Sequence, residues 1–375
     1  MREELMSVLI DRGTITARID EIVRGAEHVS IDHDRVNDLA RRMAERLLGA
    51  DRHATPTLLT PDQGPMVNDR DTLQFYLMRR SQSFTIWRWT DAAQHGVEAW
   101  DCHVNGELYT GERAVSACIM RAIDDGLPLL DADFLETITR EQLADVYRDE
   151  VTGEVTYQML DHRLEKLHEI GRVLNRFYDG HMVNLMERAD GRMFREDGNG
   201  SVQRIAADFP KSYGDEPFVK LAITVVHQLH NRLDAGLPTT EEFARLVRID
   251  DPENSLGPAD YYIPLFLTRW GVFRLSEEMT AMLRERRPIA MDSAMEREFR
   301  AATVAVFDEV QRRSGVVLAE LDHEFWYHSA FRCRPCHPGA SEEDVPCPIR
   351  DDCTAFQRRP ALMELGWPLV YTPYY

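Results

Sequence analysis

The 375-residue sequence has no apolar run near the roughly 20 residues that span a bilayer, which predicts that the chain does not cross a membrane. Met1–Leu5 carries acidic groups where a secretion signal has a basic end, so we expect a cytoplasmic protein. Basic residues are few, since 44 Lys and Arg stand against 64 Asp and Glu and give a net charge of −20. This charge repels nucleic-acid phosphate, so nucleic acid is not an expected partner without a local basic groove.

Cysteine is also scarce, but four of the six cysteines are crowded together as Cys333-x2-Cys336-x10-Cys347-x5-Cys353. Four thiolates at short spacing suit zinc or an iron–sulfur cluster. The alternatives are separate thiols or two disulfides, which are uncommon in cytosolic proteins. The Cys347–Cys353 spacing resembles the end of the [4Fe–4S] loop of helix-hairpin-helix DNA glycosylases. We therefore expect a structural [4Fe–4S] cluster, with zinc as the alternative.

Apolar residues with helical spacing dominate the rest of the chain. They mark helices over residues 36–47, 221–233 and 299–310. Capping residues predict helix starts at Thr139, Thr239 and Ser276. Pro288 is expected to stop the helix that begins at Ser276.

One stretch, residues 84–110, is typical of β-structure. Phe84–Trp89 is rich in aromatic and β-branched residues, and Asn105-Gly106 is the strongest short hairpin signal. The sequence therefore predicts a mainly α fold with a small antiparallel β-sheet. Because no flexible linker interrupts the chain, we expect one helical domain over residues 1–329. Residues 330–375 would form a four-cysteine metal-binding segment packed on it.

Two polar residues lie in apolar surroundings. Asp260 lies between Pro258 and Pro264 and precedes two tyrosines, where a carboxylate could stabilise positive charge or activate water. It could equally cap the helix that follows. Lys220 heads the apolar stripe of residues 221–233, where a lysine is more often a solvated or snorkelling end residue than a catalytic one.

Together, nine short blocks resemble the queuosine salvage family, the queuosine 5′-phosphate N-glycosylases, in the same order along most of the chain. Their shared order is more specific than any single block. The blocks are Ser83–Trp87, Tyr109–Gly111, Arg121–Pro128, His162–Leu174, Asp208–Pro210, Phe218–Lys220, Ala259–Tyr261, Leu321–Trp326 and the terminal Tyr374-Tyr375.

The resemblance implies a helical fold related to helix-hairpin-helix DNA glycosylases but acting on a free nucleotide. The implied reaction is hydrolysis of the N-glycosidic bond of queuosine 5′-phosphate, which releases queuine for reuse in tRNA. It implies no catalytic cofactor. Asp260 would be the catalytic carboxylate and Lys220 its active-site partner.

The resemblance also implies a set of substrate contacts. Phe84 and Trp87 would stack on the 7-deazaguanine base or form the wall of its pocket. Alternatively, both are core residues of the small sheet. Tyr261 would bind substrate beside the carboxylate. Asp322 and Trp326 would line the pocket wall.

Several positions depart from the family pattern. Tyr262 stands where the family has arginine, Leu265 where it has glutamine, and Gly366–Pro373 replaces a basic stretch. Ser83 replaces an asparagine, and Arg80 stands where the family has an acidic residue. Phosphate sites usually contain Arg or Lys, so the sequence leaves open whether a 5′-phosphate is required. The four cysteines are an addition to the family pattern.

Two other functions are compatible with the sequence. An Fe–S base glycosylase acting on DNA or RNA is suggested by the cysteine spacing and opposed by the net charge of −20. A non-catalytic nucleoside-binding relative is suggested by the departures that follow Asp260.

Overall fold

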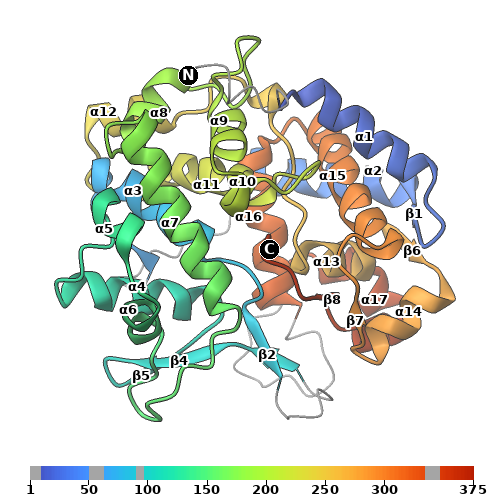
Figure 1. Cartoon of the computed structure of the whole chain (residues 1–375). Coiled ribbons are helices and arrows are strands. Elements are labelled where there is room, and N and C mark those ends of the chain that lie inside the picture. The colour runs from blue at the N-terminus through green and yellow to red at the C-terminus, as the bar shows by residue number, and fades with distance from the viewer. Residues whose placement is uncertain (1–9, 50–62, 90–96, 334–346) are drawn as a thin grey trace. The chain divides into compact units, whose positions relative to one another are not determined.

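The computed structural model describes residues 10–49, 63–89, 97–333 and 347–375 (Figure 1). Most of these residues are helical, and the strands form only two-stranded sheets, which confirms the predicted mainly α fold. None of the described helices has the length and apolar character needed to cross a bilayer.

Contacts divide the chain into two compact units that are not continuous in sequence. Unit 1 contains Met1–Arg12, Thr57–Asn254 and Thr372–Tyr375, and unit 2 contains Gly13–Pro56 and Ser255–Tyr371. This grouping differs from the boundary predicted at residue 330, because most of the C-terminal segment belongs to the same unit as residues 255–333.

Unit 1 holds the helices and strands between residues 70 and 254. Its helices are α3 (Arg70–Ser81), α4 (Glu112–Asp124), α5 (Ala132–Thr137), α6 (Arg140–Val146), α7 (Leu160–Phe177), α8 (Met182–Ala189), α9 (Ser201–Asp208), α10 (Pro210–Tyr213), α11 (Lys220–Asn231) and α12 (Glu241–Val247), with 3-10 turns η3 (Arg232–Asp234) and η4 (Pro252–Asn254). Its strands are β2 (Trp87–Trp89), β3 (Val97–Ala99), β4 (Asp101–Val104) and β5 (Glu107–Thr110).

The predicted hairpin is confirmed. β4 pairs antiparallel with β5, and Asn105 and Gly106 both adopt positive φ, as a tight two-residue turn requires. β2 pairs separately with β3, so the described β-structure between Trp87 and Thr110 consists of two short sheets and not one. Phe84 and Thr85 lie outside the strand predicted for them, since Thr85 has a φ of 44° that breaks the extended backbone.

The helix predictions hold with small shifts. Thr139 caps α6 with the predicted capping box, and Ser276 caps its helix by accepting from the Met279 N–H. The helix predicted to start at Thr239 is capped one residue later, by Thr240. Leu221, Val225 and Leu229 of the predicted apolar stripe are buried on α11 in the core of unit 1, whereas Leu233 lies in η3 beyond the helix and is half-buried.

Unit 2 consists of α1 (Arg12–Arg24), β1 (Val29–Ile31), α2 (His33–Leu48), α13 (Tyr262–Trp270), β6 (Phe273–Leu275), α14 (Glu277–Arg284), β7 (Pro288–Ile289), α15 (Ala294–Ser314), α16 (Leu318–Tyr327), the π-turn η5 (His328–Arg332), η6 (Arg350–Asp352), α17 (Thr354–Gln357), η7 (Pro360–Glu364) and β8 (Leu369–Val370). β1 pairs with β6, and β8 pairs with β7. The helix before Pro288 ends at Arg284, four residues before the proline that was expected to stop it.

The C-terminal segment is bound into unit 2 through its main chain. Arg269 of α13 donates to the carbonyls of Met363 and Leu365, and Arg35 of α2 donates to the carbonyl of Asp352. Two helix arginines thus satisfy carbonyls of an irregular segment, which explains why it groups with unit 2.

Candidate functional site

Asp260 lies at the start of α13 in unit 2 and is 7% exposed. Its Oδ1 accepts hydrogen bonds from the main-chain N–H groups of Tyr262 at 2.8 Å and Ile263 at 2.9 Å. Asp260 therefore stands one residue before the N-cap Tyr261, and its side chain satisfies the first two main-chain N–H groups of α13. These bonds are compatible with catalysis because they fix the orientation of the carboxylate.

The loop before Asp260 is held by α15. Arg300 donates from Nε to the Ala259 carbonyl at 3.3 Å and pairs with Glu296 at 3.2 Å, with both side chains buried. Gly257 packs against the ring of Phe307, since a Cβ at this position would lie 2.2 Å from ring atoms. The carboxylate therefore projects from a tightly packed loop.

Gly257→Ala should destabilise unit 2 by about 1–3 kcal/mol, because the added methyl group must displace the Phe307 ring. Urea unfolding monitored by circular dichroism measures the change. Gly25→Ala is the control, as its Cβ would meet only ordinary contacts at 3.5 Å. Equal stability of the two variants would contradict the packing argument.

Aromatic rings cluster at the start of α13, where Asp260 lies. The ring centroids of Tyr261 and Tyr262 are 4.8 Å apart, and those of Tyr262 and Trp367 are 5.2 Å apart. Trp367 also lies 6.2 Å from Tyr261. The structure thus adds to the predicted Asp260 and Tyr261 a tryptophan that sequence reasoning missed, because no local pattern connects it with α13.

Lys220 is the first residue of α11 in unit 1 and is 7% exposed, so it is a buried amine and not a solvated end residue. The preceding Val219 has a φ of 41°, a strained value for a β-branched residue. Strain of this kind concentrates at functional positions.

Glu112 lies close enough to Lys220, Arg79 and Arg80 to interact with their charges, and the sequence analysis did not identify it as a site residue. It pairs with Arg79 at 2.9 Å and Arg80 at 3.1 Å, and it accepts from the Ser83 hydroxyl at 3.1 Å. Burial raises the pKa of Glu112, but the charges of Arg80, Arg79 and Lys220 outweigh it and lower the pKa to about 2. Glu112 supplies the negative charge in this region, where Arg80 stands at the position of the family's acidic residue.

Phe84 is fully buried, and two basic side chains contact its ring. The Arg163 guanidinium carbon lies 4.0 Å from its ring centroid and the Lys166 Nζ lies 4.5 Å from it. Lys166 also donates to the carbonyls of Ser212 at 3.0 Å and Pro373 at 2.6 Å. These contacts support the alternative that Phe84 is a core residue. Its role in stacking on the base stays a prediction.

The burial of Lys166 lowers its pKa to about 7, with the Arg163 charge acting in the same direction. Between pH 7 and its ordinary value of 10.5, the unfolded chain binds the proton that the folded chain releases, so stability rises with pH. Relative to Lys166→Met, the wild type should gain about 1 kcal/mol between pH 8 and 9. Urea midpoints measure this gain, and the exposed Lys211→Met is the control; a parallel pH profile would contradict the shift.

The other predicted substrate contacts are Trp87 in unit 1 and Asp322 and Trp326 in unit 2. Trp87 is 1% exposed and packs edge-on against Trp89 at 5.1 Å. Asp322 and Trp326 are half-buried on α16, four residues apart and so on one face of the helix. Their roles stay predictions.

Cys336 lies outside the described residues. Cys333 and Cys347 are buried, and Cys347 Sγ lies 3.8 Å from His328 Nδ1. Cys353 Sγ lies 3.4 Å from the Arg269 carbonyl oxygen. Within the described ranges, no three His, Cys, Asp or Glu side chains gather closely enough to hold an ion.

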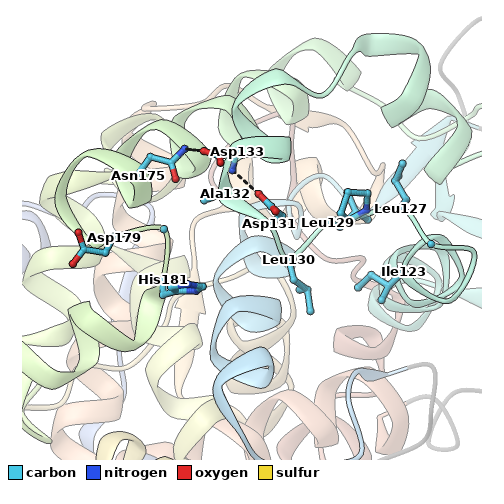
Figure 2. A pocket seen from close by; sticks show the side chains of 13 residues that line it. Ile123, Leu127, Leu129, Leu130, Asp131, Ala132, Asp133, Asn175, Asp179 and His181 are labelled. Atoms are coloured by element: carbon cyan, nitrogen blue, oxygen red, sulfur yellow. Dashed lines mark hydrogen bonds between the residues drawn. The ribbon is translucent and has the colours of Figure 1, made fainter.

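A pocket of about 540 Å³ lies in unit 1, where the start of α5 meets the α7–α8 connection (Figure 2). Asp131 and Asp133 line one side, and Asp179 and His181 line another. Asn175 donates to Asp133 at 2.9 Å. The predicted site residues are absent from the lining of this described pocket.

A capped, buried carboxylate beside aromatic rings is suited to stabilising positive charge on a bound ring compound. The sequence matches the model of the queuosine salvage protein family over residues 63–324. This match covers more than half of the chain, and the chain belongs to that family.

Curated relatives agree with this assignment. A Sphaerobacter thermophilus protein named queuosine 5′-phosphate N-glycosylase/hydrolase is 28% identical over 309 residues, or 80% of this chain and 86% of the relative. Relatives of the same name are 24% identical in Mus musculus, covering 78% and 82%, and 23% identical in Schizosaccharomyces pombe, covering 70% and 76%. The family resemblance noted in the sequence is thereby confirmed.

Proposed function

We propose that this chain hydrolyses the N-glycosidic bond of queuosine 5′-phosphate and releases queuine in the cytoplasm. The observation that carries the proposal is family membership over residues 63–324 together with relatives named for this activity. The presence of a buried, oriented carboxylate at Asp260 adds chemical support.

The reaction has simple requirements. The C1′–N bond breaks with its electron pair going to the base, and the ribose gains oxocarbenium character that the Asp260 carboxylate stabilises. Water adds its oxygen to C1′. One proton of this water stays on the new C1′ hydroxyl, and the other is transferred to the leaving nitrogen of the base. Lys220 is proposed as the second active-site group on its match to the Phe218–Lys220 block.

The test is incubation of the purified chain with queuosine 5′-phosphate, queuosine and guanosine 5′-phosphate, with free base detected by mass spectrometry. We expect queuine from the first substrate and no guanine from the third. Comparison of the first two substrates decides whether the 5′-phosphate is required. Binding of nucleotide without any base release would contradict the proposal and favour a non-catalytic relative.

We also propose that Cys333, Cys336, Cys347 and Cys353 hold a structural [4Fe–4S] cluster or, alternatively, zinc. The donor set supports this, because four thiolates suit either group. The group would brace unit 2 and take no part in the reaction.

Metal removal provides the check. Protein purified without oxygen should contain about four irons or about one zinc per chain by elemental analysis. Chelation should then lower the melting temperature, and Cys353→Ser should lower the metal content while Cys102→Ser leaves it unchanged. Wild-type protein with less than about a tenth of an equivalent of either metal would overturn the proposal.

A further inference from the structure

Main-chain contacts hold Asp260 on both sides within unit 2. Its Oδ1 accepts from two N–H groups at the start of α13, and the Ser329 hydroxyl donates to the carbonyl of Tyr262. On the other side, Arg300 of α15 donates from Nε to the carbonyl of Ala259, the residue directly before Asp260, at 3.3 Å. The direction of the carboxylate therefore depends on a contact from α15 as well as on contacts from α13.

Arg300 forms a buried ion pair on α15. Its guanidinium lies 3.2 Å from the carboxylate of Glu296, one helical turn earlier, and the two side chains are 5% and 2% exposed. Taking two charges out of water is costly, and a well-packed apolar pair of similar size is often at least as stable. Arg312 and Asp308 form a pair with the same spacing on the same helix, but there the side chains are 66% and 36% exposed. The stability of α15 therefore does not explain why the Arg300–Glu296 pair is buried.

The pair is explained by what Arg300 contacts outside its own helix. Ala259 is fully buried, so its carbonyl depends on a donor from within the protein, and Arg300 supplies one. A guanidinium is planar and its N–H groups point in fixed directions, so the bond to Glu296 also fixes the bond to Ala259. Movement of Arg300 would move the Ala259 peptide and the carboxylate one residue later.

We propose that Arg300 and Glu296 are positioning residues for the Asp260 carboxylate. They act through the main chain before Asp260 and not by contact with substrate. This inference rests on the proposed function, in which Asp260 stabilises the oxocarbenium character of the ribose. A displacement of about 1 Å at a reacting group can cost about 100-fold in rate, so the pair contributes to bond cleavage through geometry.

The experiment replaces both members of the pair at once, as Glu296→Leu with Arg300→Met, because removing one alone would leave the other charge buried without its partner. In hydrolysis of queuosine 5′-phosphate, kcat and kcat/KM should fall together by about 10- to 100-fold, since the position of the carboxylate matters in the transition state. The melting temperature should stay within about 5 °C of wild type, because the apolar pair offsets the lost bond to Ala259. Asp308→Leu with Arg312→Met is the matched control and should keep the wild-type kcat.

A double-mutant cycle with Asp260→Asn tests whether the pair acts through Asp260. Single-turnover rates are measured for wild type, the paired replacement, Asp260→Asn and their combination. In the Asp260→Asn background, the paired replacement should change the rate by less than about twofold, because the charge that it misplaces is already absent. An equal loss in both backgrounds would show a general structural effect and overturn the inference.

Arg300→Lys keeps the charge beside Glu296 and carries the test if the paired replacement does not fold. An ammonium lacks the fixed fork of the guanidinium, so the bond to Ala259 should be lost and kcat should fall by about tenfold. A kcat within about twofold of wild type in either folded variant would overturn the inference and leave the proposed function intact. Failure of the wild type to release queuine would instead overturn the proposed function, and the inference with it.

Discussion

Asp260→Asn is expected to reduce the rate of queuine release by about 100- to 1,000-fold, the usual cost of removing one group that stabilises transition-state charge. Asparagine retains a side-chain oxygen that can accept from Tyr262 and Ile263, so the start of α13 should keep its geometry. The change therefore removes the negative charge and preserves the cap. Single-turnover kinetics with queuosine 5′-phosphate measures the chemical step directly.

Asp69→Asn provides the matched control. Asp69 caps α3 by accepting from the Thr72 N–H, so the substitution makes the same chemical change at another helix start. Its rate should equal that of wild type, and circular dichroism should show both variants folded. A folded Asp260→Asn protein with full activity would exclude Asp260 as the catalytic carboxylate.

Glu112→Gln is expected to destabilise the protein by about 3 kcal/mol. The substitution leaves Arg79 and Arg80, each with a 6% exposed side chain, without their shared carboxylate. The lowering of the Glu112 pKa from 4.5 to about 2 corresponds to a stabilisation of that size. Urea unfolding at pH 7 gives the difference, and the exposed Glu154→Gln is the control.

Stability measured at acidic pH tests whether the charge of Glu112 explains the expected destabilisation of Glu112→Gln. Because the folded-state pKa of Glu112 lies below its ordinary value, its contribution is complete above about pH 4.5 and is lost as the pH falls toward 2. The stability gap between wild type and Glu112→Gln should therefore narrow below pH 4.5. A constant gap down to pH 3 would show that packing, and not charge, explains the loss.

Local patterns predicted local structure well. The Asn105-Gly106 turn, the Thr139 capping box and the buried stripe on α11 all occur as expected, because each depends on interactions between residues close in sequence. The strand expected from Phe84 was shortened by the positive φ of Thr85. Thr85 bonds to the distant Thr372 and Tyr375, and no local pattern indicates those contacts.

The sequence by itself determined the family, the helical class and the identity of Asp260 as a residue at a helix start, since these follow from the order of short blocks and from capping chemistry. Tertiary structure alone decided that Glu112 neutralises Arg79 and Arg80, and that Trp367 adjoins Tyr262. The physical reason is chain separation. Ion pairs and ring contacts between distant segments depend on how the helices pack, and packing places residues that no local pattern connects.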